Sequence, residues 1–525
     1  MIKTRTIFTL LFLCAVSTLF AQKKALETIN ENDLKAHLEF VASDLMQGRD
    51  FYTAVPGLEL TANYIQSQCK KLGLKPGFDG YFQPVEMLSS KPDSDNTYFQ
   101  LIGADGKVVF EEKDIFALGG KTENDTVSGD IVFTGYGWYD DATKYNDTEG
   151  LDLKGKIAVV MTRNPEMVKN GDKNNMQIEM QKMQKALMGG AQAILFVSDP
   201  KNPDQEYINS IKKYATGGSL QLKGARSNPR IRINLLFGTA ELGNQIIKES
   251  GKTLAQIQQN ISETGKPESF DIKEVSAQVL LGKITSVIEG TNVVAVVEGR
   301  DPVLKNECVV YSAHYDHLGL DGESGIFNGA DDNGTGTVAL LEIAEAYQSL
   351  KKKPKRSIVF AWVTAEEKGL IGSDYYSQNP FIPLENTLAD INLDMVGRSA
   401  EKEPDPEAEV EKSLAGPNGI YIVSGKQSSE LMKISNDICN DLGLVPSDKL
   451  SEAFLSRSDY YHFYKNGVPV LGLSTGLHDD YHTVNDELDK IDYTKMKRVA
   501  QYAFLVGEKI ANQKQRILVD KPSNQ

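Results

Sequence analysis

The sequence predicts an α/β protein with a mostly parallel, doubly wound sheet covered by helices and interrupted by an inserted β-rich domain. After residue 284, near-continuous apolar runs alternate with amphipathic helical segments, which is typical of a parallel sheet buried on both faces. Residues 92–275 instead contain mainly short strands and turns. We therefore expect one discontinuous domain, residues 25–90 with 280–515, and one insertion, residues 92–275.

Residues 30–72 have the spacing of helices. The segment 'LKAHLEFVASDLMQG' places Leu34, Leu38, Val41 and Leu45 on one face, and 'GLELTANYIQSQCKKLGL' repeats the pattern before it stops at Gly73. In the insertion, one helical stretch at 176–188 lies among short strands such as 'GKIAVVMTR' and 'AQAILFVSD'. The insertion is thus expected to have its own, separate core.

The strands expected in the main sheet follow one another with helices between them, at 336–350 and 493–511 among others. They are 'NVVAVVEG' (292–299), 'ECVVYSA' (307–313), 'SIVFAWVT' (357–364), 'DINLDM' (390–395), 'IYIVSG' (420–425) and 'VPVLGLS' (468–474). In such sheets, ligands bind at the carboxyl ends of the strands.

Composition limits the possible functions. The 525 residues carry a net charge of −15, which argues against a nucleic-acid partner, because binding phosphates requires clustered Lys and Arg. Residues 1–21, 'MIKTRTIFTLLFLCAVSTLFA', have the basic, apolar and small-residue regions of a signal peptide, so export is expected. No later apolar run is long enough for a membrane span, and the oligomeric state is left open.

The cysteines predict no disulfide framework. Without Cys14 of the signal peptide, the chain keeps Cys69, Cys308 and Cys439, an odd number without close spacing. We expect all three to be small buried hydrophobic residues.

Polar side chains gather where the expected strands end. His314 and Asp316 follow the strand at 307–313, and Glu366 with Glu367 follows 357–364. Further candidates at the same edge are Asp331, Asp332, Asp394 and His482. Imidazole and carboxylate ligands from several strand ends favour a catalytic zinc site with open positions over a closed structural one.

Local spacing adds detail to this site. His314 and Asp316 are two residues apart and point the same way in an extended chain, so Asp316 is expected to accept the second imidazole N–H while the other nitrogen binds metal. Glu366 and Glu367 are adjacent and point apart, so one can bind metal while the other faces the substrate.

Five motifs in this order, 'HYDH', 'GADDNGTGT', 'TAEEKGLIGS', 'LDMVGR' and 'YHTVND', resemble the co-catalytic two-zinc exopeptidases. That family includes secreted bacterial aminopeptidases, aminopeptidase Y and glutamate carboxypeptidase. The segments 'IVFTGYGWYD' and 'ALMGGAQAILFVSD' look like the protease-associated domain inserted in many members. The resemblance implies the zinc exopeptidase fold, a peptide substrate and two zinc ions per chain.

The resemblance also implies a role for each site residue. Asp332 bridges both metals; one zinc takes His314 and Asp394, and the other takes Glu367 and His482. Glu366 is then the general base, Asp316 the partner of His314, and Tyr481 a donor to the developing negative charge. Three ligand carboxylates against two divalent ions leave one positive charge, which a hydroxide bridging the metals would cancel. A cis peptide bond is expected between Asp332 and Asn333, whereas His37, His317, His462 and His478 receive no metal role.

Several reactions remain compatible with these motifs. We expect an aminopeptidase, but carboxypeptidases of the glutamate carboxypeptidase type share the metal set. A glutaminyl-cyclase-like acyl transferase would use one zinc, which the complete two-site ligand set disfavours. A non-catalytic receptor-type relative should have lost ligands or the base, and none is missing.

Overall fold

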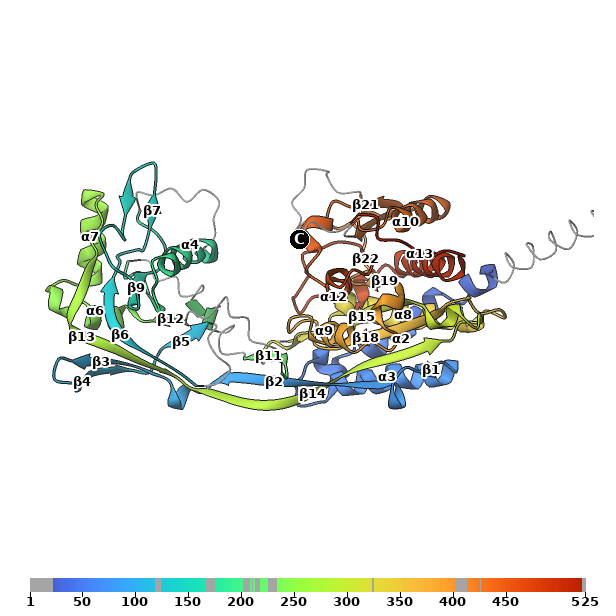
Figure 1. Ribbon diagram of the computed structural model, residues 1–525, viewed down its shortest axis with the longest axis horizontal. Coiled ribbons are helices and arrows are strands. Elements are labelled where there is room, and N and C mark those ends of the chain that lie inside the picture. Colours follow the sequence, from blue (N-terminus) through green and yellow to red (C-terminus); the bar gives the residue numbers. More distant parts are fainter. Residues whose placement is uncertain are drawn as a thin grey trace, which may run out of the picture. The chain divides into compact units, whose positions relative to one another are not determined.

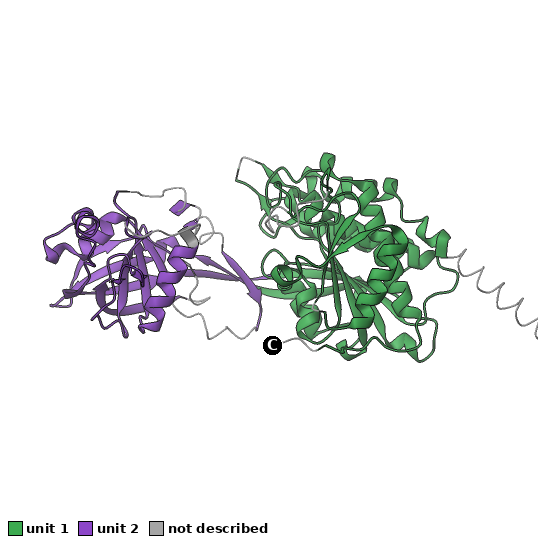
Figure 2. Ribbon diagram, turned by 90° about the horizontal axis from the view of Figure 1, so that it is seen from above, with its two compact units in different colours: residues 1–87, 289–525 green, residues 88–288 purple. Residues whose placement is uncertain are grey.

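The computed structural model describes residues 22–118, 124–166, 175–201, 208–209, 211–212, 218–224, 234–322, 325–402, 413–424 and 426–521. The expected signal peptide, residues 1–21, lies outside the described residues. The chain divides into two compact units: unit 1 comprises Met1–Met87 and Glu289–Gln525, and unit 2 comprises Leu88–Ile288 (Figure 2). Among the described residues, no helix is long and apolar enough to cross a membrane.

The centre of the unit 1 sheet is parallel, which confirms the α/β fold class. Strands β18 (Ser357–Val363), β15 (Cys308–His314), β19 (Thr387–Leu393) and β22 (Val470–Ser474) lie side by side in this order and run parallel. Strands β15, β18 and β19 are buried along their whole length, as expected for a sheet covered on both faces.

The flanks of this sheet are mixed rather than parallel. Strand β14 (Lys283–Val297) pairs antiparallel with β18, and β20 (Gly419–Val423) pairs antiparallel with β22. Unit 1 also contains β1 (Lys75–Pro76), the longer β2 (Phe82–Pro92) and β21 (Val445–Ser447), together with the antiparallel pair of β16 (Gly319–Leu320) and β17 (Ile326–Phe327).

Helices cover both faces of the sheet (Figure 1). One face packs against α2 (Glu31–Val41), α3 (Gly57–Leu72), α8 (Gly336–Ser349), α10 (Ser429–Leu442) and α13 (Tyr493–Asn512). The other face packs against α9 (Ile371–Gln378), α11 (Ser451–Phe454) and α12 (Tyr460–Lys465). As predicted, α3 ends before Gly73, whose φ of 72° is left-handed and suits glycine. Cys69, Cys308 and Cys439 are free and buried, as the sequence predicted.

Unit 2 has its own sheet and core. The strand order is β4-β3-β13-β6-β9-β10-β12-β5, and the stretch β6-β9-β10-β12 is parallel. The strands are β3 (Tyr98–Gly103), β4 (Val108–Glu112), β5 (Phe116–Leu118), β6 (Asp125–Phe133), β9 (Ile157–Met161), β10 (Ala193–Val197), β12 (Asn234–Gly238) and β13 (Phe270–Leu281).

The helical content of unit 2 exceeds the prediction of one helix. The expected helix is α4 (Asn175–Met188), but α6 (Ala240–Ile246) and α7 (Leu254–Thr264) are also present. Thr253 and Gln256 form a capping box at the start of α7, and Leu254, Ile257 and Ile261 bury one face of it. The spacing of these three residues is helical, and no helix was predicted at this position.

Candidate active site

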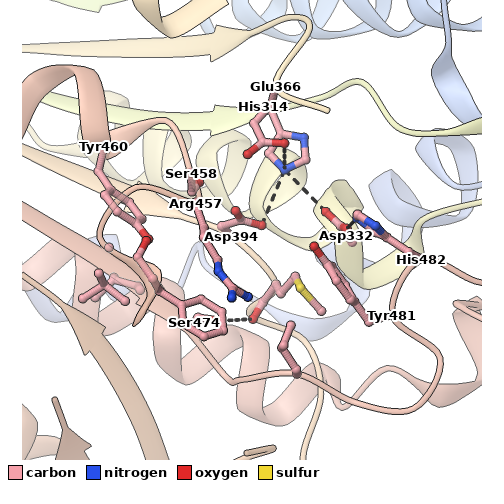
Figure 3. Close-up of a pocket in the computed structure, with 16 residues that line it drawn as sticks. His314, Asp332, Glu366, Asp394, Arg457, Ser458, Tyr460, Ser474, Tyr481 and His482 are labelled. Carbon is pink, nitrogen blue, oxygen red and sulfur yellow. Dashed lines mark hydrogen bonds and ion pairs between the residues drawn. The ribbon is translucent and has the colours of Figure 1, made fainter. Parts of the chain in front are cut away.

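The site begins where the central strand β15 ends. His314 is the last residue of β15, and its side chain is 1% exposed. Its Nε2 lies 3.4 Å from Asp332 Oδ1 and 3.5 Å from Asp394 Oδ1, and 3.9 Å from Glu366 Oε2 (Figure 3). The strand end therefore aims one imidazole nitrogen at three carboxylates.

The loop between β15 and α8 supplies Asp332. Asp332 lies in η6 (Ala330–Thr335), the turn directly before α8, and the Asp332–Asn333 peptide bond is cis, as the resemblance implied. The carboxylate of Asp486 accepts the backbone N–H groups of Asp331 and Asp332 at 3.0 Å each. Asp486, from a distant segment of the chain, thus holds the backbone of this turn, and the Asp332 side chain faces the site.

The ends of two further strands supply the remaining carboxylates of the site. Asp394 follows β19, where its backbone N–H donates to the Leu473 carbonyl at 3.1 Å. Glu366 and Glu367 follow β18, and their backbone N–H groups donate to the carboxylate of Asp316 at 3.0 and 3.2 Å. Parallel strands thus bring residues far apart in the sequence to one edge of the sheet.

The role of Asp316 differs in detail from the expectation. His314 Nδ1 lies 3.2 Å from the backbone carbonyl oxygen of Asp316 and 3.8 Å from its carboxylate. The acceptor for that imidazole is therefore the backbone of Asp316, because the carboxylate is engaged by the amides of Glu366 and Glu367. Burial raises the pKa of Asp316 to about 6.

His482 reaches the site from a loop rather than from a strand end. Its side chain is 35% exposed, and its Nε2 lies 3.1 Å from Asp332 Oδ2 and 3.3 Å from Glu367 Oε2. The ring of Tyr481 stacks on the His482 ring with centroids 3.8 Å apart. Both residues line a pocket whose wall also contains His314, Asp332 and Asp394 (Figure 3).

The predicted metal ligands form two sets that share Asp332. We call His314, Asp332 and Asp394 the His314 side, and His482, Asp332 and Glu367 the His482 side. Two ligand atoms on a tetrahedral zinc ion, each 2.0–2.2 Å from it, lie about 3.3–3.6 Å apart. The imidazole-to-carboxylate distances on the two sides are 3.1–3.5 Å, so the donor set fits such ions.

The ionisable side chains of this cluster shift one another's pKa values. Burial alone would raise the pKa of Asp332, yet its contacts with His314 and His482 hold that pKa well below its usual value. Burial likewise opposes charge on His482, but Asp332 and Glu367 raise its pKa to about 10. Burial raises the pKa of Glu366 well above its usual value, and Glu367 adds to the effect. Glu366 therefore retains a proton more readily than Asp332 or Glu367.

Sequence reasoning missed two buried cations beside the site. The fully buried guanidinium of Arg49 donates to the carbonyl oxygens of Tyr315 at 2.9 Å, Asn328 at 2.6 Å and Gly329 at 2.9 Å. Arg398 donates to Asp480 at 2.7 Å, within the loop that carries His482. Arg398 ends the recognised motif 'LDMVGR', and Arg49 directly follows the segment 'LKAHLEFVASDLMQG', but nothing in their spacing indicated these partners.

The motif-bearing residues 292–506 match the family model described as Peptidase family M28. This part of the chain is similar to peptidase family M28. The match confirms the resemblance to the zinc exopeptidases that the five motifs indicated. It does not extend over residues 92–275, so the protease-associated domain there stays a prediction.

Similar proteins are known for the M28 part. Leucine aminopeptidase 2 of Trichophyton equinum is 31% identical over 218 residues, and aminopeptidase Y of Saccharomyces cerevisiae is 27% identical over 228 residues. Each alignment covers 39% of this chain, and it covers 39% and 36% of the relatives, respectively, so the chain spans under two fifths of their length.

One solved structure shares the fold over nearly the whole chain. The aminopeptidase from Aneurinibacillus sp. strain AM-1 superposes with a TM-score of 0.54 and covers 96% of this chain and 100% of its own. The sequence identity is 18%, so this likeness supports the fold alone.

Proposed function

We propose that this protein is an exported exopeptidase that holds two zinc ions and releases N-terminal residues from peptides. The observation that carries the proposal is the pair of ligand sets that meet at Asp332, with donor spacings suited to zinc on both sides. The names of the relatives, leucine aminopeptidase 2 and aminopeptidase Y, support the choice of reaction. Export rests on the signal-peptide pattern of residues 1–21.

In this proposal, bound zinc ions would polarise the scissile carbonyl and lower the pKa of the attacking water. Glu366 takes the proton of that water and passes it to the leaving amine. Its raised pKa suits this role, because the carboxyl must hold the proton between the two steps. Asp316 fixes the backbone of Glu366, and the Tyr481 hydroxyl donates to the negative charge that develops on the carbonyl oxygen.

The pocket that contains the proposed metal ligands has a partly apolar wall. Its apolar side chains are Val423, Phe454, Tyr460, Leu473 and Leu477. We therefore expect an apolar residue at the amino terminus of the substrate.

One feature favours carboxypeptidase activity as the second candidate. Arg457 lines the same pocket, with its guanidinium carbon 4.7 Å from the centroid of the Phe454 ring. A guanidinium in this position could bind the terminal carboxylate of a substrate.

The deciding experiment combines metal analysis with one peptide presented in three forms: free, N-acetylated and C-amidated. We expect two zinc ions per chain and cleavage of the free and the C-amidated peptide from the N-terminus. Cleavage of the N-acetylated peptide together with loss of activity on the C-amidated one would make the protein a carboxypeptidase. One zinc per chain with cyclisation of N-terminal glutamine would identify an acyl transferase.

The variant Glu366→Gln tests the proton transfer. Glutamine keeps the size of the side chain but cannot accept the proton, so kcat should fall by roughly 10²–10⁴-fold. Both zinc ions should remain, because Glu366 belongs to neither ligand set. Turnover close to that of the unaltered protein would remove Glu366 as the base.

A further inference from the structure

His317 is a buried histidine beside the His482 side of the site. Its side chain is 0% exposed, and its Nδ1 lies 2.8 Å from Glu367 Oε1 in a hydrogen bond. The same nitrogen lies 3.9 Å from Asp332 Oδ2, so His317, Asp332 and Glu367 also form a set that could hold an ion. The sequence analysis gave His317 no metal role, and the position of its ring calls for an explanation.

The distance between His317 and Glu367 shows whether His317 would be a second ligand of the same metal ion or a hydrogen-bond partner of Glu367. The separation of 2.8 Å between His317 and Glu367 is shorter than the roughly 3.3–3.6 Å that two atoms on one tetrahedral zinc require. It is the length of a charge-assisted hydrogen bond. Because an ionised carboxylate only accepts, Nδ1 carries the proton, and it cannot bind a metal at the same time.

Surrounding backbone fixes this ring. The His317 backbone N–H donates to the Arg49 carbonyl at 3.2 Å. A Cβ atom placed on Gly329 would lie 2.4 Å from His317 Cδ2, so the ring packs directly on that glycine. The imidazole therefore has a defined position before any ion binds.

The two oxygens of Glu367 have different partners. Oε1 accepts from His317, whereas Oε2 lies 3.3 Å from His482 Nε2, the spacing of two ligands on one ion. A carboxylate held at one oxygen keeps the other pointed at the metal position.

We infer that His317 is a positioning residue that orients Glu367 for the metal on the His482 side and is not itself a ligand. The inference rests on the proposed two-metal function. Its consequence is that His317 selectively sets the affinity of the His482 side, since neither His314 nor Asp394 is bonded to it.

Two substitutions test this inference by metal affinity. His317→Leu removes the donor, whereas in His317→Asn the amide nitrogen can take the place of Nδ1. Zinc binding is measured by titration of the chelator-treated protein, with folding checked by circular dichroism and thermal unfolding. We expect His317→Leu to bind the ion of the His482 side 10–100-fold more weakly while still taking up two ions at saturation, and His317→Asn to recover most of the affinity.

His462 provides the matched control, because its Nδ1 lies 3.1 Å from Asp374 Oδ1 and its side chain is 11% exposed. His462→Leu should leave both zinc affinities unchanged. Unaltered affinity in His317→Leu would overturn the inference, as would loss of one ion at saturation in both His317 variants, which would make His317 a ligand. If the unaltered protein binds a single zinc, the proposed two-metal function fails, and that result is separate from any effect of His317.

Discussion

The His314 side and the His482 side of the site use the same kinds of ligand on different scaffolds. His314 ends a buried strand, and Asp394 follows the neighbouring parallel strand, so the sheet itself sets their spacing. His482 lies in a loop and is 35% exposed, against 1% for His314. The His482 side therefore depends on contacts outside the sheet for its geometry.

Those additional contacts come from charged and polar neighbours. Asp486 holds the backbone of Asp332, His317 bonds Glu367, and Arg398 bonds Asp480 in the loop that carries His482. The comparison teaches that adjoining strand ends set the spacing of two ligands through the sheet itself, whereas a loop ligand requires contacts with neighbouring side chains to hold it. A substitution should consequently weaken metal binding on both sides or on one side only, depending on which residue it alters.

The largest effect is expected where the two sides meet. Asp332→Ala removes the carboxylate common to both, so both ions should be lost and activity should fall to background. His482→Ala should instead leave one ion on the His314 side. Metal analysis of the two variants after dialysis measures the difference. Two ions retained by Asp332→Ala would show that the two sides do not share this residue.

The sheet and the residues at its edge were predictable because both follow from periodicity. Apolar runs fixed the strands, and the polar residues directly after them, His314, Glu367 and Asp394, were identified from that position. The antiparallel flanks were not predictable, since a buried strand has the same composition in either direction. The assignment of His482 rested on its motif, because no strand end precedes it directly.

The partners of the ligands were harder to foresee. Arg49 lies 283 residues from Asp332 in the sequence, and its hydrogen bonds go to backbone carbonyls, which no residue type reveals. The Asp316 carboxylate was expected to bond the His314 imidazole, yet it accepts the backbone N–H groups of Glu366 and Glu367 instead. The hydrogen-bond partners of such residues depend on where the chain turns after its strand, and the spacing of residues in the sequence does not determine that turn.

A smaller and one-sided effect is expected from the loop contact. Asp480→Asn removes the charge that bonds Arg398 at 2.7 Å and leaves the ion pair between Arg398 and Asp486 at 3.6 Å in place, so the loop should hold His482 less firmly. We expect zinc on the His482 side to bind about tenfold more weakly and zinc on the His314 side to bind as before. Arg516→Gln, which alters an ion pair with Glu307 at 3.3 Å, is the matched control. Equal weakening on both sides would contradict the comparison.

The smallest effect concerns pH and the protein stripped of metal. Contacts with Asp332 and Glu367 raise the pKa of His482 to about 10, so its ion pairs stabilise the fold fully below its ordinary value of 6.5. This stabilisation declines as pH rises from 6.5 through 10. The pKa of Glu367 is lowered to about 2, so its own contribution is lost only when pH falls from 4.5 toward 2.

His482→Gln should therefore destabilise the stripped protein most at pH 5–6.5, by no more than about 1 kcal/mol because the ring is partly exposed. The difference should vanish near pH 10. His314→Gln should show a larger loss at pH 6, because the carboxylates around that fully buried ring raise its pKa well above the usual value. Urea unfolding at pH 6, 8 and 10 measures both variants. The comparison would be contradicted if the loss of unfolding free energy in His482→Gln grew with pH. It would also be contradicted if that loss exceeded the loss in His314→Gln, because the His314 side would then not be the more rigid half.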